Sequence, residues 1–228
     1  MGFSYKKARI TAVAFNRCGL RILPYSIGCF KHLKELHITE NRLRNLPESI
    51  GNLPSLQKLN LNDNHLIELP NEIGNLINLK EFNLNHNIIQ LLPESISKLK
   101  QLEVLSIWGN QLRNLPKNMH EMDSLKVLGL SFNQLEEFPN LISEFKNLEI
   151  LDLSNNLVKT IPENIGYLKS LKHLWLNNNP LNVIPVSLVD LQSLTDLYIV
   201  NKTIATKKDV EINSIFNRLQ AMDINIWR

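Results

Sequence analysis

Histidines and acidic residues recur along this sequence and could bind a metal ion. The chain has six histidines, and Asp63 and His86 lie 23 positions apart, one period of a repeat that organises the whole sequence. Together with the nearby His65 they would offer two imidazoles and a carboxylate, a ligand set that zinc accepts. No dense H-x-x-x-H or C-x-x-C spacing accompanies them, so we expect a solvated polar surface with no metal and no cofactor.

Other kinds of chemistry have no support in the sequence. It contains neither a glycine-rich loop with phosphate-binding spacing nor a nucleophile elbow. Its two cysteines cannot build a disulfide framework, which fits a reducing compartment. The sequence therefore predicts no catalytic residues and a protein that is not an enzyme.

Proline, asparagine and leucine recur together every 23 residues. Eight of the ten prolines keep this spacing: Pro24, Pro47, Pro70, Pro93, Pro116, Pro139, Pro162 and Pro185. The asparagines in step with them are Asn41, Asn64, Asn87, Asn110, Asn133, Asn156 and Asn179. Stacked units of this kind form a solenoid, because a single unit cannot bury its own apolar face.

Each unit reads L-x-x-L-x-L-x-x-N-x-L-x-x-L-P-x-x-I-x-x-L-x-x. Leu36 and Ile38 alternate around His37, as in a short strand with one face buried. After Pro47 apolar residues recur every third position from Ile50 onward, which predicts one helical turn, α or 3₁₀. The asparagine stands where the chain leaves the strand, and its amide can satisfy backbone groups of neighbouring coils.

This pattern resembles the leucine-rich repeat in its 23-residue L-P-x-x-I class, found in bacterial repeat proteins and in intracellular Ras-suppressor-like proteins. The resemblance covers residues 10 to about 200. It implies an α/β fold, a curved horseshoe with a parallel β-sheet on the concave face and short helical turns on the convex face. It also implies an intracellular scaffold or a bacterial effector-like protein.

The concave side chains lie between the buried leucines, and nothing in the fold dictates them. Their first half is rich in asparagine, whereas the second half gathers the predicted partner-binding residues, Trp108, Phe132, Trp175, Tyr198, Val104, Val127 and Ile150. Exposed aromatic residues are typical of interfaces. The alternative is that these large side chains pack together and only stiffen the sheet.

Two finer expectations concern the arrangement of these apolar residues. Trp175 and Tyr198 occupy identical places in adjacent units, so their rings should stack about 5 Å apart. A smaller apolar run of Ile67, Ile88 and Leu91 lies on the loops after the strands, where we expect partial burial between coils.

We expect one leucine-rich repeat domain over residues 1–228. An N-terminal segment, 1–9, precedes eight repeats, 10–193, and a ninth repeat with a C-terminal cap, 194–228. The cap should contain a helix from Val210 to Leu219 and a strand from Met222 to Ile226, with Met222 in the place that Leu197 takes one unit earlier. The alternative is one longer helix through Ile226. Cys18 stands in the place of the first asparagine, so we expect it to be buried.

The predicted function is protein–protein interaction through the concave face, with a protein partner of unknown identity. A structural or self-associating solenoid, or a fragment of a larger multidomain protein of the bacterial effector kind, stays open as an alternative. We expect a monomer, or a weak homodimer through an open end of the sheet.

Charge and hydropathy exclude several partners and compartments. A net charge of +3 is too small to indicate nucleic acid. No run of 18 apolar residues indicates a membrane span, and no apolar segment after Met1 indicates a secretory signal. We therefore expect no membrane contact and a cytoplasmic location, with export by a signal-less bacterial route left open.

Overall fold

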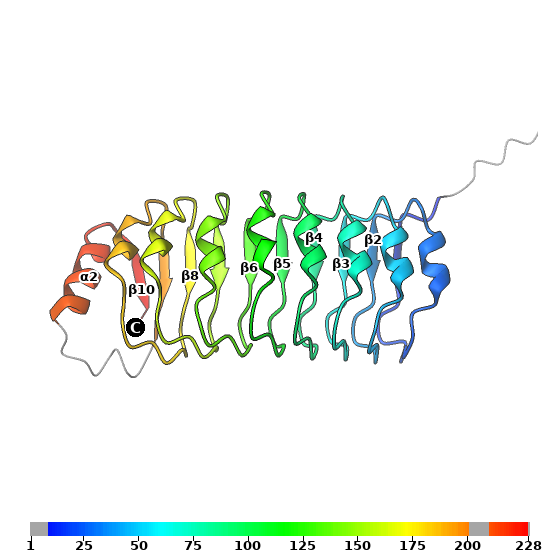
Figure 1. Cartoon of the computed structure of the whole chain (residues 1–228), viewed down its shortest axis with the longest axis horizontal. Coiled ribbons are helices and arrows are strands. Elements are labelled where there is room, and N and C mark those ends of the chain that lie inside the picture. The colour runs from blue at the N-terminus through cyan, green and yellow to red at the C-terminus, as the bar shows by residue number, and fades with distance from the viewer. Residues whose placement is uncertain (1–8, 201–209, 228) are drawn as a thin grey trace, which may run out of the picture.

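The computed structural model describes residues 9–200 and 210–227, and within them the chain forms one open parallel sheet (Figure 1). Its ten strands follow one another in chain order, and the sheet is open, with β1 and β10 as its two edge strands. The strands are β1 Ala12–Ala14, β2 Glu35–His37, β3 Lys58–Asn60, β4 Glu81–Asn83, β5 Val104–Ser106, β6 Val127–Gly129, β7 Ile150–Asp152, β8 His173–Trp175, β9 Asp196–Tyr198 and β10 Asn225–Trp227. The predicted leucine-rich-repeat solenoid is confirmed. Most of the N-terminal segment that we expected over 1–9 lies outside the described residues.

Short 3₁₀ helices lie opposite the strands, one in each coil, where a coil is one 23-residue unit. They are η1 Tyr25–Cys29, η2 Glu48–Asn52, η3 Asn71–Asn75, η4 Glu94–Lys98, η5 Lys117–Glu121, η6 Asn140–Glu144, η7 Glu163–Tyr167 and η8 Val186–Asp190. Each begins directly after a repeat proline. Pro93, for example, is extended at φ −69° and ψ 146°, and its carbonyl oxygen accepts the N–H of Ile96 at 3.0 Å. Of the two predicted kinds of turn, the structure forms the 3₁₀ turn.

The core is a set of leucine and isoleucine rows that run through the coils. The central residue of a strand points inward, so Leu36 and Leu59, paired in register between β2 and β3, are fully buried. Ile50 from η2 is also fully buried and closes the coil from the helical side. The residues on either side of each central leucine are left on the outer surface of the sheet.

The repeat asparagines bridge the coils, as the sequence predicts. Asn110 is 7% exposed, and its Oδ1 accepts the backbone N–H of Ile89 at 3.0 Å. Its Nδ2 donates to the carbonyl oxygens of Leu84, 2.9 Å away in the preceding coil, and Ile107, 3.2 Å away in its own. The same set of bonds recurs at Asn64, Asn87, Asn133 and Asn156. One side chain therefore satisfies backbone groups of two coils where the strand ends.

The C-terminal cap has the predicted elements in a different register. Helix α2 spans Val210–Gln220 and buries Phe216, while β10 pairs in parallel with β9 and places Ile226 beside Leu197. Met222, which we expected beside Leu197, is 43% exposed, so that register is wrong, and so is the alternative of one helix through Ile226. The cause is α2, because its 11 residues lengthen this coil beyond the 23-residue period.

Cys18 is exposed, contrary to the burial that we expected. It belongs to the coil of β1, the edge strand of the described sheet, so no earlier described coil covers it. Its thiol donates weakly to the carbonyl oxygen of Asn16 at 3.4 Å.

The asparagine bridge leads to a stability prediction. Asn110→Ala should lower the free energy of unfolding by about 1–3 kcal/mol, because the buried N–H of Ile89 loses its side-chain acceptor. The carbonyl oxygens of Leu84 and Ile107 each lose one of two asparagine donors. Denaturant melts measure this loss. Asn114→Ala is the matched control, since Asn114 is exposed in the same coil and should change stability by less than about 0.5 kcal/mol. Equal losses in the two variants would contradict the role of the bridge.

The cap leads to a second prediction. Deleting residues 210–228 should lower the melting temperature and cause concentration-dependent association, because β9 becomes an open edge and the last coil loses the apolar face of α2. Thermal melts and sedimentation velocity measure both effects. Met222→Ser, at an exposed position of the same segment, is the control and should change neither. A truncated chain that stays monomeric with an unchanged melt would show that the cap is dispensable.

Candidate functional site

The outer surface of the sheet, which we call the strand face, carries all the predicted partner-binding residues. It is formed by the first and third residues of each strand and by the second and third residues after the strand ends. The first residues of β5, β6 and β7 are Val104, Val127 and Ile150, which pair in register as one row of half-buried side chains. The structure therefore brings the predicted apolar row together.

The first half of the strand face is polar, but part of that polarity supports the backbone. Asn62 Oδ1 accepts the N–H of Asn85 at 2.8 Å, and Asn85 Oδ1 accepts the N–H of Trp108 at 3.0 Å. Asn85 is 9% exposed and also accepts a hydrogen bond from Ser106 Oγ at 2.8 Å. From the sequence pattern we expected these asparagines on the concave surface with no role in the fold. That interpretation missed the second ladder of hydrogen bonds that they form between coils.

The Trp108 cluster consists of His86, Trp108 and Phe132. The Trp108 ring lies edge-on to the imidazole of His86, with ring centroids 3.8 Å apart, and its centroid is 6.2 Å from that of Phe132. Gly109 makes this packing possible, because a Cβ there would lie 3.0 Å from His86 Nδ1. His86 was missed as a member of this cluster, since spacing alone associated it with Asp63.

Phe132 combines an exposed side chain with an unfavourable backbone conformation. It is 55% exposed, and its φ of 53° lies in the left-handed region. A bulky residue rarely adopts this conformation, which costs about 1 kcal/mol or more. The other described non-glycine residues with positive φ are polar or charged: Arg17, Glu40, Asp63, His86, Asn155, Asn178 and Asp223.

The ring ladder consists of Trp175, Tyr198 and Trp227 at the third position of β8, β9 and β10. Trp175 and Tyr198 stack with centroids 5.4 Å apart and planes 12° apart, so the predicted stacking is confirmed. Trp227, 54% exposed, extends the stack beyond Tyr198 at 5.6 Å and 5°. The sequence pattern missed Trp227 because its strand register was wrong. The true register places Trp227 beside Tyr198.

A hydrogen-bonded carboxylate lies beside the ring ladder. Asp196 accepts hydrogen bonds from Thr195 Oγ1 at 2.7 Å and Asn225 Nδ2 at 3.0 Å, and its Oδ2 lies 2.8 Å from His173 Nδ1. These bonds, from Thr195 first and then Asn225, hold the pKa of Asp196 below its ordinary value. The network joins β10 to β9, and the His173 ring lies 5.7 Å from that of Trp175. It therefore supports the ring ladder.

The structure does not build a metal centre around Asp63. His86 packs against Trp108 instead, and no three His, Cys, Asp or Glu side chains converge within residues 9–200 and 210–227 in a way that could hold a metal ion. Among the described helices, none contains an apolar stretch of the length that a bilayer span needs.

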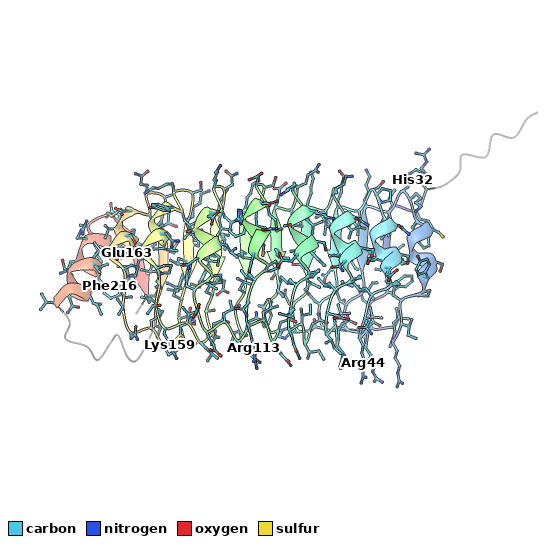
Figure 2. The ribbon with its side chains drawn as sticks, viewed as in Figure 1. His32, Arg44, Arg113, Lys159, Glu163 and Phe216 are labelled. Atoms are coloured by element: carbon cyan, nitrogen blue, oxygen red, sulfur yellow. The ribbon has the colours of Figure 1, made fainter. Side chains whose placement is uncertain are left out.

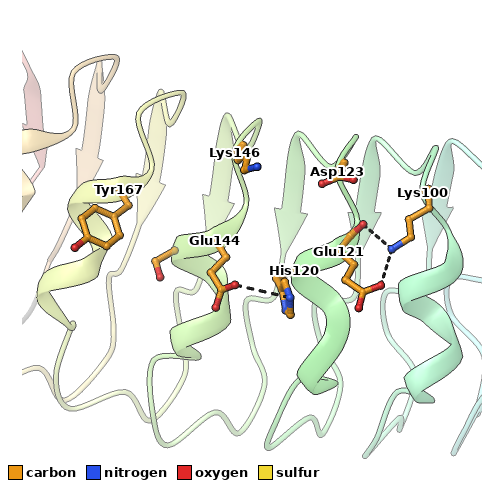
Figure 3. A pocket seen from close by; sticks show the side chains of 8 residues that line it. Lys100, His120, Glu121, Asp123, Glu144, Lys146 and Tyr167 are labelled. Atoms are coloured by element: carbon orange, nitrogen blue, oxygen red, sulfur yellow. Dashed lines mark hydrogen bonds and ion pairs between the residues drawn. The ribbon is translucent and has the colours of Figure 1, made fainter.

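A shallow pocket on the helical side holds acids and bases that pair with one another (Figure 3). Lys100 Nζ donates to Glu121 Oε2 at 2.8 Å, and His120 Nε2 lies 3.8 Å from Glu144 Oε2. His120 occupies the position at which other coils have a glycine such as Gly74. A Cβ added at Gly74 would lie 2.3 Å from the Ser95 carbonyl oxygen. The pocket thus lies where the row changes from glycine to larger side chains.

Comparisons with known proteins agree with this architecture. The family model described as "Leucine-rich repeat region" matches residues 71–156, and the one described as "Leucine rich repeat" matches residues 21–66 and 146–204. No curated protein sequence matches the chain.

Solved structures with the same fold include two plant receptors. The plant peptide hormone receptor RGFR1, in complex with RGF2, is 28% identical with a TM-score of 0.68, over 78% of this chain and 31% of that chain. The ectodomain of the Arabidopsis thaliana membrane receptor kinase GASSHO1/SCHENGEN3, in complex with CASPARIAN STRIP INTEGRITY FACTOR 2, is 26% identical with a TM-score of 0.73, over 84% and 24%. The chain thus spans between about a quarter and a third of these two structures. FLRT2, in an octameric complex with Latrophilin 3 and Unc5D, shares the fold at 22% identity and a TM-score of 0.74, over 85% and 61%.

The 23-residue period, the parallel sheet with its 3₁₀ turns, the asparagine bridges and the two family models all agree. The chain belongs to the leucine-rich repeat family.

Proposed function

We propose that this chain is a non-enzymatic protein-binding module whose partner contacts the second half of the strand face. The observation that carries the proposal is Phe132. It contributes no core burial, at 55% exposure, and its positive φ makes the folded state less stable than a polar residue would. A residue that costs stability and exposes an aromatic ring is best explained by an interaction outside the chain.

The two aromatic groups form anchors of the kind that interfaces use. Binding energy concentrates in a few large aromatic side chains that sit in a preformed arrangement. The rings of the ring ladder hold one another in place, so little conformational freedom remains to be lost on binding. The residues of the Trp108 cluster follow β4, β5 and β6, and the ring ladder starts on β8, roughly 10–15 Å from Phe132. One helix or one extended segment of a partner can span that distance.

The relatives support a protein or peptide partner. RGFR1 and GASSHO1/SCHENGEN3 are both leucine-rich repeat neighbours above 25% identity, and both structures are complexes with a second molecule. The polar residues favour binding over catalysis, because in the described residues they pair along ladders rather than converge on one point. The cytoplasmic location and the monomeric state stay predictions from the sequence.

Self-association is the second candidate function. The described sheet has open edges at β1 and β10, and Trp227 lies on the second of them. A molar mass measured in solution separates the two functions, since a binding module of this kind stays monomeric until its partner is added.

Substituting the two tryptophans tests the binding face. Trp108→Ala and Trp175→Ala should each weaken partner binding by at least about 2 kcal/mol, measured by calorimetry with a partner identified by affinity capture. Folding should be nearly intact, because both side chains lie outside the core rows. The control is Asn83→Ala, on β4 in the polar half, which should bind like the unaltered chain. A partner whose affinity ignores both tryptophans would refute the proposal.

Replacing Phe132 should change stability and binding in opposite directions. Phe132→Asn places the residue type of Asn155 at the same backbone position, so the free energy of unfolding should rise by about 0.5–1 kcal/mol while partner affinity falls. Denaturant melts and calorimetry on the same samples give both numbers. The control is Asn155→Ala, which should lower stability without changing affinity. If Phe132→Asn lowers stability and leaves affinity unchanged, the ring has a structural role only.

A further inference from the structure

A pocket lined by basic side chains lies on the loops, away from the strand face. Four residues line it, Arg21, Arg42, Arg44 and His65. Arg21 and Arg44 hold the same position in the first two coils, and Arg42 and His65 hold the same position in the second and third. Figure 2 shows Arg44 on the lower edge of the molecule, in line with Arg113 and Lys159. We call these four residues the basic pocket.

Backbone hydrogen bonds fix the spacing of the basic pocket. The N–H of Arg42 donates to the carbonyl oxygen of Leu20 at 2.8 Å, and the N–H of His65 donates to that of Leu43 at 2.9 Å. The coils are therefore held about 5 Å apart here, as neighbouring strands are. Arg42 and Arg44 are two positions apart, so in extended chain they project from the same side. The pocket therefore spans three coils, with Arg21 on the first, Arg42 and Arg44 on the second and His65 on the third.

None of the four side chains has a hydrogen-bond or ion-pair partner among residues 9–200 and 210–227. Nearby charges are already paired, since Arg17 Nε lies 2.7 Å from Glu40 Oε2 and Lys58 Nζ lies 3.0 Å from Glu81 Oε1. Like charges on directly opposed residues are unfavourable. The fold does not require them, because the same two positions hold isoleucine and glutamine in the following coils. A bound anion would supply the counter-charge that the chain lacks.

Apolar side chains continue the same loop surface beyond the basic pocket. Ile67, Ile88 and Leu91 are exposed, at 42%, 38% and 63%, so the partial burial between coils that the sequence predicted is wrong. The N–H of Ile67 donates to the carbonyl oxygen of Arg44 at 3.3 Å, so the apolar run begins directly beside the pocket. A ligand that fills the pocket therefore meets apolar surface on one side.

We propose that the basic pocket binds a phosphate monoester carried by a protein segment, with apolar residues of that segment on Ile67, Ile88 and Leu91. Guanidinium groups bind phosphate oxygens through paired hydrogen bonds, and three of them match the two negative charges of a phosphorylated side chain. A nucleic acid or a lipid bilayer would need an extended basic surface, whereas this one ends at the third coil, where Ile67 and Glu68 follow His65. This site is separate from the strand face and does not depend on its function.

A phosphoserine-oriented peptide library tests the proposal. One phosphoserine is fixed and the flanking positions vary, so the direction of binding need not be known. The unaltered chain should retain phosphorylated peptides and enrich leucine, isoleucine or valine on one side of the phosphoserine. The enriched peptide, labelled for fluorescence anisotropy, should bind at least about tenfold more weakly to the Arg21→Gln, Arg44→Gln double variant. Its affinity should also fall as salt rises.

Matched variants separate the possible results. Arg113→Gln removes an arginine from the same position three coils later, where its Nε donates to Gln134 Oε1 at 3.4 Å, and it should leave binding unchanged. Leu91→Ser should remove the apolar preference and keep the phosphate requirement, while Trp108→Ala should leave both intact. Equal binding of unphosphorylated serine peptides, or equal loss with Arg113→Gln, would overturn the proposal. Tighter binding of a single-stranded RNA oligonucleotide through Arg21 and Arg44 would overturn its assignment to a protein segment.

Discussion

The amide of the repeat asparagine is the group on which the rest of this structure depends. Where each strand ends the backbone turns inside a packed stack, and its N–H and C=O groups would be buried without partners. Asn110 satisfies such groups in two coils with one side chain, through bonds to Ile89, Leu84 and Ile107. Because Oδ1 and Nδ2 both bond the preceding coil while Nδ2 also bonds its own coil, the amide also sets the spacing at which the coils stack.

Only the core, turn and bridge positions of each coil are constrained by the fold, so the surface positions can vary in residue type. The buried rows need only leucine or isoleucine, the turn needs proline and the bridge needs asparagine. The other positions of each coil carry the differences between coils. The strand face and the basic pocket are made entirely of such positions, and they lie on different parts of the coil. A core of this kind therefore leaves room for two separate variable surfaces on one chain.

The sequence predicts the fold well, because each coil repeats the same local pattern. A unit that departs from the pattern can still be assigned from the eight others. The stacking of Trp175 on Tyr198 was predictable for the same reason, since identical positions of adjacent coils lie side by side.

Contacts between different positions were not predictable. The packing of His86 on Trp108 depends on the space at Gly109. The positive φ of Phe132 follows from the turn, which spacing alone does not reveal. Trp227 was missed because α2 breaks the period on which the register relied.

The asparagine bridge also restricts how such a chain can change its length. Its bonds reach residues 21 and 26 positions earlier, so both partners keep their places only if whole units are gained or lost. The distance between the Trp108 cluster and the ring ladder can then change only in steps of one coil, about 5 Å. Duplication or loss of a unit between them would move the two clusters apart or together by one coil without altering either cluster. The stacking period of the solenoid therefore quantises the separation between surface clusters, which evolution can change only by whole coils.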